Sequence, residues 1–420
     1  MKDSEKKKLL LITDNYPFGL GDSFLFTEIE FLLEYFSITV ISTNTHSEIS
    51  SEYTHNFSIY RINKDLRTLE ALKYAVQCFL KKEFYNEIKQ LSKKSRHLGS
   101  VLFHIITTFS KSLKFADEIR KLDIIIKQDI IYCYWHNYKV LGVGFLVSDL
   151  QKSKIPIVSR IHGYDLYNER TKCKQQLFKH AMDKYLSMLF FVSEYGYTYY
   201  KREFGFIPTC EYKVSRLGVH GGDRLTKMSE QYDLSLISVS SAIPLKRIEL
   251  IVLSLELVTD YSIRWVHFGD GNSLSVIKEL SDRKLKSKAN ITYIFMGHTS
   301  NHGIHDFYKA EGIDVFITTS STEGIPVSIQ EAFSYGVPVI GTRVGGIPEM
   351  IDEGVNGLLI SENPCPQEVK GAIDRMFQLK NTDYFYQMKQ NAFLTWSERF
   401  DAERNYRIFA ENLYELALAR

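Results

Sequence analysis

The chain has 420 residues, of which 44% are hydrophobic and 24% are charged, a composition typical of globular proteins. This composition excludes disordered, collagenous and coiled-coil chains. The 52 basic and 50 acidic residues leave a net charge of +2, which argues against a partner bound through bulk charge, such as nucleic acid. At roughly 100–200 residues per domain, the length predicts two domains or slightly more.

The cysteine content and the N-terminal residues indicate the cellular compartment of the protein. The five cysteines are widely spaced and form no C-x-x-C pair, which argues against zinc and redox motifs and predicts free thiols in a reducing compartment. The charged start has no signal-peptide apolar region, and no apolar run reaches the ~18–20 residues that span a bilayer. We therefore expect a cytoplasmic protein that can also bind peripherally at the inner face of the cell membrane.

The first part of the chain alternates short apolar strands with helices. The predicted elements are strand 8–13, the Gly- and Pro-containing loop 14–23, helix 24–35, strand 37–43, helices within 64–121, and strands 130–134, 155–159 and 189–192. A strand, a glycine loop, a helix and a second strand open a doubly wound α/β domain.

A second alternation follows a polar stretch without periodicity. The predicted elements are strand 234–240, helix 247–258, strands 262–268, 291–296, 315–319 and 337–341, and an amphipathic helix in 398–420. We therefore expect an α/β protein with two Rossmann-like domains. The predicted parts are a first domain 1–220, a linker 221–232, a second domain 233–397, and a C-terminal helix 398–420 that packs back on the first domain. Ligands in such folds bind beyond the carboxyl ends of the strands.

Basic residues are concentrated in residues 61–121, which hold 14 basic and 6 acidic residues, a net charge of +8. A Lys-rich helical segment of this kind suits an anionic membrane surface better than nucleic acid. The cluster best placed for this contact comprises Lys81, Lys82, Lys93, Lys94 and Arg96. A solvated helix face explains the same charge, and both readings stay open.

The stretch 320–350 reads SSTEGIPVSIQEAFSYGVPVIGTRVGGIPEM and carries most of the chemistry. Pro326 is placed to begin a helix after a strand, so that backbone N–H groups and the helix dipole form an anion site. Glu323 precedes this helix and Glu331 lies within it, and carboxylates accept hydrogen bonds from sugar hydroxyls. The spacing alone also fits two ordinary glutamates.

The order of these motifs resembles the signature of the retaining family 4 glycosyltransferases, which have the GT-B fold. The matching pattern is E-G-x-P, a second Glu, A-x-x-x-G-x-P-V-I and G-G-x-x-E. The loops HGYD at 162–165, SSAIPLKR at 240–247 and GDG at 269–271 are also similar to loops of the family. The residues of these loops are most similar to those of the capsular and exopolysaccharide branch of the family, which includes colanic-acid-type transferases.

The resemblance implies two Rossmann-like domains that face a cleft. It also implies retaining transfer of a hexosyl group from a nucleoside diphosphate sugar to a hydroxyl of a glycan or lipid-linked glycan, in the synthesis of surface polysaccharide. We expect a UDP-sugar, with GDP left open. No D-x-D motif occurs, so neither a metal nor a cofactor is expected.

The same resemblance assigns site residues. The expected catalytic residues are His162, Lys246 and Glu323. The expected donor-binding residues are Gly21, Ser241, Lys246, Arg247, Gly297, His298, Glu323, Gly324, Ile325, Val327 and Glu331. Ser241 stands where many members of the family have a phosphate-binding arginine, so either Ser241 or Arg247 is expected to replace it.

Other functions remain as alternatives. A sugar-nucleotide epimerase or a phosphorylase would use the same architecture, and a non-enzymatic protein that binds the membrane surface would use the basic segment. A nicotinamide dehydrogenase is disfavoured because Gly19-Leu20-Gly21 is followed by Phe24 where G-x-G-x-x-G needs a third glycine.

Overall fold

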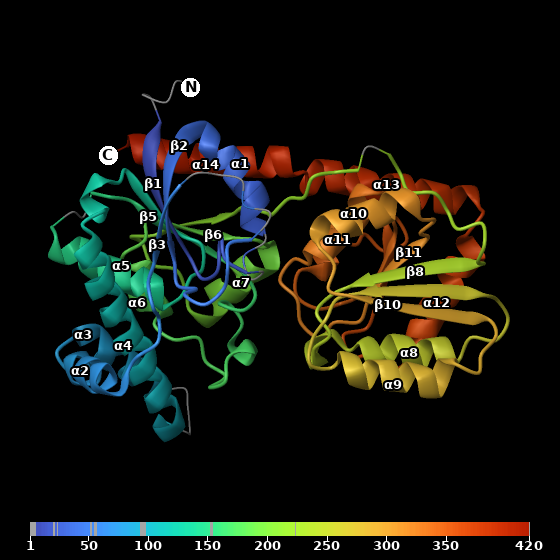
Figure 1. Cartoon of the computed structure of the whole chain (residues 1–420), viewed down its shortest axis with the longest axis horizontal. Helices are drawn as coiled ribbons and strands as arrows, with labels where there is room; N and C mark the ends of the chain where they lie inside the picture. The colour runs from blue at the N-terminus through green and yellow to red at the C-terminus, as the bar shows by residue number, and fades with distance from the viewer. Residues whose placement is uncertain are drawn as a thin grey trace. The chain divides into compact units, whose positions relative to one another are not determined.

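The computed structural model describes residues 6–19, 22, 24–50, 53, 57–92, 98–151, 154–222 and 224–419. The chain divides into two compact units, Met1–Ser215 with Tyr406–Arg420, and Arg216–Asn405. Each unit is built on one sheet of parallel strands with helices around it (Figure 1). The predicted α/β fold class with two Rossmann-like domains is therefore confirmed.

The first unit contains a seven-stranded sheet in the order β3-β2-β1-β4-β5-β6-β7. Its strands are β1 Lys7–Thr13, β2 Phe36–Ser42, β3 Ser58–Arg61, β4 Ile130–Cys133, β5 Ile157–Ile161, β6 Met188–Phe191 and β7 Glu211–Val214. The central strands are apolar on both sides because helices cover both faces. Their carboxyl ends therefore meet at one edge, where the loop that follows β5 carries His162.

The helices of the first unit form two cores, one on each face of the sheet. They are α1 Phe24–Tyr35, α2 Thr68–Cys78, α3 Lys82–Ser92, α4 Leu98–Leu122, α5 Tyr138–Asp149, α6 Lys179–Asp183, α7 Glu194–Glu203 and the last turns of α14 Ala402–Leu418. Phe409 and Leu413 of α14 pack in one core with Leu9 and Leu11 of β1. Among the described residues, no helix is both long enough and apolar enough to cross a bilayer.

The second unit contains a six-stranded sheet in the order β10-β9-β8-β11-β12-β13. Its strands are β8 Leu234–Val239, β9 Ile263–Phe268, β10 Ile291–Gly297, β11 Val315–Thr318, β12 Val339–Thr342 and β13 Gly357–Ile360. Its helices are α8 Ile248–Glu256, α9 Leu274–Leu285, α10 Asn301–Ala310, α11 Val327–Ser334, α12 Pro366–Leu379 and α13 Asp383–Arg399. Helices α8, α9 and α12 cover one face of the sheet, and α10, α11 and α13 cover the other (Figure 1).

The boundary between the units differs from the predicted one. It falls between Ser215 and Arg216, and the stretch 221–232 lies inside the second unit. Backbone hydrogen bonds attach this stretch to the second unit. The Thr226 N–H donates to the Tyr335 carbonyl at 2.9 Å, and the Ile313 N–H donates to the Lys227 carbonyl at 3.0 Å. The last helix begins at Ala402, since α13 is a separate helix that ends at Arg399.

Candidate functional site

An ion pair joins two of the predicted catalytic residues of the second unit. Lys246 follows β8 in the short 3-10 helix Pro244–Lys246, and Glu323 follows β11. The Lys246 ammonium lies 2.5 Å from Glu323 Oε1, and the two side chains are 23% and 10% exposed. Because β8 and β11 are neighbouring parallel strands, their carboxyl ends bring these charges together. An anion bound here would share the Lys246 ammonium with Glu323.

Arg247, predicted as one replacement for the missing phosphate-binding arginine, is occupied by other acceptors. Four of its five N–H groups donate to protein oxygens: the carbonyls of Thr319 at 2.7 Å, Ser320 at 2.9 Å and Glu362 at 2.8 Å, and Asn363 Oδ1 at 3.2 Å. Its backbone adopts a left-handed φ of 48°, which directs the side chain toward the end of β11. The other predicted replacement, Ser241, is exposed. Arg247 therefore supports the loops of the site, and the sequence alone did not reveal this role.

Two glycines of the 341–346 loop lie against the backbone of Glu323 and Gly324. Gly345 has a φ of +53°, and a Cβ there would come within 1.8 Å of the Glu323 carbonyl oxygen. The Gly346 N–H donates to the Gly324 carbonyl at 2.8 Å. The motifs E-G-x-P and G-G-x-x-E thus form one packed unit, and glycine is required for the close approach.

Helix α11 begins directly after this contact. Pro326 is its N-cap residue and Val327 its first residue, and no side chain in the described part of the chain caps the helix. The N–H groups of an uncapped first turn are left for water or a ligand, and the helix dipole favours an anion there. Ile325, which precedes the cap, is only 6% exposed and anchors the turn in the core.

Glu331 lies in the second turn of α11 and is 5% exposed. Burial raises the pKa of its carboxyl to about 7, and a hydrogen bond from Asn301 opposes this rise. The Asn301 Nδ2 group donates to Glu331 Oε1 at 2.7 Å. Asn301 begins α10 and was not found by sequence reasoning, because no motif marks it. Asn301 therefore fixes the position of the Glu331 carboxylate, which can accept further hydrogen bonds.

The remaining predicted residues of this unit lie at the same edge of the sheet. The Gly269 N–H donates to the Gly297 carbonyl at 2.8 Å, and the Ser240 N–H donates to the Phe268 carbonyl at 2.9 Å. These bonds tie together the loops that follow β8, β9 and β10. Gly297 ends β10 with a φ of +69°, and His298 is exposed beside it.

His162 belongs to the first unit and follows β5. It is 8% exposed, and its ring lies 4.8 Å from the Tyr134 ring and 4.6 Å from the Trp135 ring, centroid to centroid. Burial, aided by the charge of Arg160, lowers its pKa well below the usual value, so the imidazole is neutral. Among the described residues, neither ring nitrogen has a hydrogen-bond partner. Both ring nitrogens are thus buried polar atoms to which a ligand could hydrogen-bond.

A buried network holds the His162 loop in place. Asp165 accepts the backbone N–H of His162 at 2.7 Å and that of His136 at 2.8 Å. The Lys179 ammonium donates to the carbonyls of His136 and Asp165, both at 2.6 Å. Burial lowers the Lys179 pKa to about 8. Lys179 is a positioning residue that sequence reasoning missed. Gly21, predicted to bind the donor, lies outside the described residues.

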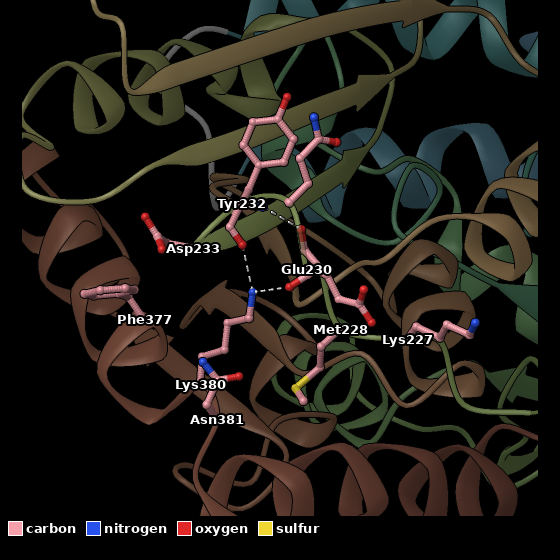
Figure 2. Close-up of a pocket in the computed structure, with 10 residues that line it drawn as sticks. Lys227, Met228, Glu230, Tyr232, Asp233, Phe377, Lys380 and Asn381 are labelled. Atoms are coloured by element: carbon pink, nitrogen blue, oxygen red, sulfur yellow. Dashed lines mark hydrogen bonds between the residues drawn. The ribbon is translucent and has the colours of Figure 1, made fainter.

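A cavity of about 620 Å³ lies elsewhere in the second unit, beside the stretch 227–233 (Figure 2). None of the predicted site residues lines it. The Lys380 ammonium points to the backbone of this stretch and donates to the carbonyls of Ser229 at 2.8 Å and Tyr232 at 3.0 Å. It also pairs with Asp314 at 2.9 Å. Lys380 therefore attaches the stretch to α12 and is not open to a ligand.

Comparison with known proteins identifies a domain within the second unit. Residues 229–393 match the family model described as glycosyl transferases group 1. The N-acetyl-alpha-D-glucosaminyl L-malate synthase of Bacillus anthracis is 28% identical over 187 residues, which cover 43% of this chain and 46% of that protein. A protein of Salmonella typhimurium named as a colanic acid biosynthesis glycosyltransferase, WcaL, is 45% identical over 56 residues, which cover 12% of this chain and 14% of that protein. The chain thus spans less than half the length of these two relatives.

The fold is also that of solved glycosyltransferase structures. Anabaena HepE in complex with UDP superposes with a TM-score of 0.68 at 17% identity, over 97% of this chain and 100% of that one. At this identity the likeness shows the fold alone: two domains, each built on a parallel sheet, as in GT-B glycosyltransferases. Residues 229–393 accordingly resemble the glycosyl transferases group 1 family, in a chain whose fold is like that of GT-B glycosyltransferases.

Proposed function

We propose that the protein is a retaining glycosyltransferase of the hexosyltransferase type. It transfers a sugar from a UDP-sugar to a hydroxyl of a glycan or lipid-linked glycan in the synthesis of surface polysaccharide. The observation that carries the proposal is the Lys246–Glu323 pair beside the uncapped start of α11, within the glycosyl transferases group 1 domain. The UDP in the HepE structure supports the choice of nucleotide, and the name of WcaL supports the polysaccharide pathway.

The chemical step needs positive charge at the leaving group. The bond between the anomeric carbon and the diphosphate oxygen breaks, and the acceptor oxygen forms the new bond on the same face of the sugar. The acceptor proton passes to an oxygen of the departing phosphate. Lys246 and the first-turn N–H groups of α11 stabilise the charge that develops on the diphosphate. No protein nucleophile takes part in this proposal.

The other site residues bind the donor. Glu331 accepts hydrogen bonds from the ribose hydroxyls, and Glu323 accepts them from hydroxyls of the donor sugar. His162, with a neutral ring, hydrogen-bonds the sugar. The backbone at Gly297 and His298 contacts the base. Arg247 acts indirectly, because it fixes the carbonyls of Thr319 and Ser320 next to Glu323.

We further propose that the reaction needs no metal and no cofactor, because the sequence has no D-x-D motif and Lys246 with the helix start supplies the charge. A lipid-linked acceptor is presented at the inner face of the cell membrane. The protein is accordingly proposed to be cytoplasmic and peripheral to that membrane.

A screen for nucleotide release tests the proposed function. The purified chain is incubated with a panel of UDP- and GDP-sugars, with and without excess EDTA. We expect slow release of UDP from one UDP-sugar, in equal amounts with and without EDTA, and no release by a Glu323→Gln variant. Absence of release from every sugar nucleotide would contradict the proposed activity. Loss of release in EDTA, restored by magnesium or manganese, would contradict only the metal-free mechanism.

The raised pKa of Glu331 predicts a pH dependence of UDP binding. Ribose hydroxyls donate to the carboxylate, so binding favours the ionised form, and UDP affinity should weaken as the pH falls below about 7. Glu331→Gln should lower affinity about 10- to 100-fold above that pH and remove this dependence, because a charged acceptor is lost. Calorimetry across this pH range measures both effects. Glu256→Gln, at a half-exposed glutamate of α8, serves as the control, and an unchanged profile in Glu331→Gln would refute the assignment.

Lys246 and Arg247 should behave differently on substitution. Lys246→Ala should lower turnover by about 100- to 1000-fold, because the charge acts on the departing diphosphate, and should leave the thermal midpoint almost unchanged. Arg247→Ala should lower the thermal midpoint, because the part-buried carbonyl oxygens of Thr319 and Ser320 lose their donor. Steady-state kinetics and thermal unfolding of both variants check this. Near-normal turnover of Lys246→Ala would show that another cation binds the diphosphate.

A further inference from the structure

Helix α2 turns a row of large apolar side chains to solvent. Leu69 is 83% exposed, Leu72 66% and Val76 59%, and Phe79 and Leu80 just after the helix are 52% and 79% exposed. Leu69, Leu72 and Val76 are separated by three and four positions and so share one helix face. We call these five residues the apolar stripe. A contiguous exposed apolar surface of this kind marks an interaction site.

The stripe is not the face by which α2 joins the protein. The opposite face carries Tyr74 and Cys78, which are buried in the core of the first unit. The Tyr74 hydroxyl donates to Asp117 on α4 at 3.1 Å. Within the first unit, α2 and α3 lie beside α4 and away from the strands (Figure 1). The inner face of α2 is therefore buried in the first unit, and the apolar stripe on its outer face is exposed to solvent.

The charge around the stripe indicates an anionic partner. The segment 61–121 has a net charge of +8, and at least four of its six acidic side chains are bound within the protein. Their contacts are Glu70 with Lys114 at 3.0 Å, Asp117 with Arg120 at 3.4 Å, Glu118 with Lys121 at 2.7 Å, and Glu87 with the Phe178 N–H at 2.8 Å. Exposed basic residues flank the stripe, with Lys64 and Arg67 before it and Lys82 after it.

We propose that the apolar stripe inserts into the surface of an anionic lipid bilayer, with the flanking basic residues on the phospholipid headgroups. An interfacial helix of this kind combines apolar burial with attraction to anionic lipid. Each basic residue at the headgroups strengthens binding about fivefold. A second copy of the chain fits the stripe less well, because its own +8 segment would be repelled. The proposal concerns a surface outside the nucleotide-binding residues and does not depend on the proposed reaction.

The apolar stripe adds a contribution to membrane binding that the basic cluster predicted from the sequence does not provide. Of the cluster named from the sequence, Lys82 is exposed, and Lys81 is half-buried with its ammonium 5.2 Å from the centroid of the Phe145 ring. Lys93, Lys94 and Arg96 lie outside the described residues. The apolar side chains therefore supply a part of the binding that salt does not screen.

Vesicle sedimentation tests the proposal. The full chain is mixed with vesicles of phosphatidylcholine alone, or of phosphatidylcholine with phosphatidylglycerol, at low and at high salt. We expect binding to the anionic vesicles, with a weaker but measurable part that remains in high salt. Leu69→Ser/Leu72→Ser should lower binding by about 100-fold, since an inserted leucine contributes roughly tenfold or more. The matched control Val276→Ser/Leu394→Ser, at exposed apolar positions of the second unit, should bind like the wild type.

Several outcomes would overturn the proposal. These are no binding of the wild type to anionic vesicles, equal binding by the wild type and the stripe variant, or a wild-type dimer that the stripe variant converts to monomer. The far-UV circular dichroism and the thermal midpoint of the stripe variant show whether it is folded. Its UDP affinity, measured on the same preparation, should equal that of the wild type. The two measurements therefore distinguish a loss of membrane binding from a loss of nucleotide binding.

Discussion

The close contact between two loop backbones determines the geometry of the candidate site. A Cβ at position 345 would come within 1.8 Å of the Glu323 oxygen, and one at position 346 within 2.2 Å of the Gly324 oxygen. Both obstacles are backbone atoms, so no side-chain movement could make room for them. The loops that follow β11 and β12 can approach this closely only through glycine. This contact fixes Glu323 where it meets Lys246 and fixes the turn that begins α11.

Hydrogen bonds in both directions extend this constraint to the loop that follows β8. The Ser321 N–H donates to the Leu245 carbonyl at 2.8 Å, and the Thr319 hydroxyl donates to the Arg247 carbonyl at 2.9 Å. In return, the Arg247 guanidinium donates to the Thr319 and Ser320 carbonyls. These bonds fix the backbone that carries Lys246, and the contact with Glu323 holds its ammonium. A preorganised charge of this kind is most useful for a departing anion.

The sequence predicted the fold class because buried parallel strands appear as short apolar runs between periodic helices. It placed the unit boundary differently, since the stretch 221–232 is polar, and the backbone bonds that attach it leave no pattern in the residues. The motif residues Lys246, Glu323 and Glu331 were identified, but the Lys246–Glu323 ion pair and the partner of Glu331 were not. Asn301 lies 30 positions from Glu331, and only the packing of α10 beside α11 brings them together. The spacing of Leu69, Leu72 and Val76 shows that they share a face, but not that this face is exposed.

Calorimetry of UDP binding to matched glycine variants tests whether the contact between the two loops sets the nucleotide site. Gly345→Ala would place its Cβ against the Glu323 backbone, whereas Gly371 on α12 has nothing within 4 Å of an added Cβ. We predict that Gly345→Ala lowers UDP affinity by at least about tenfold, which corresponds to the loss of one strong hydrogen bond or more. Gly371→Ala should bind UDP like the wild type. Wild-type affinity in Gly345→Ala would show that the contact between the two loops does not set the nucleotide site.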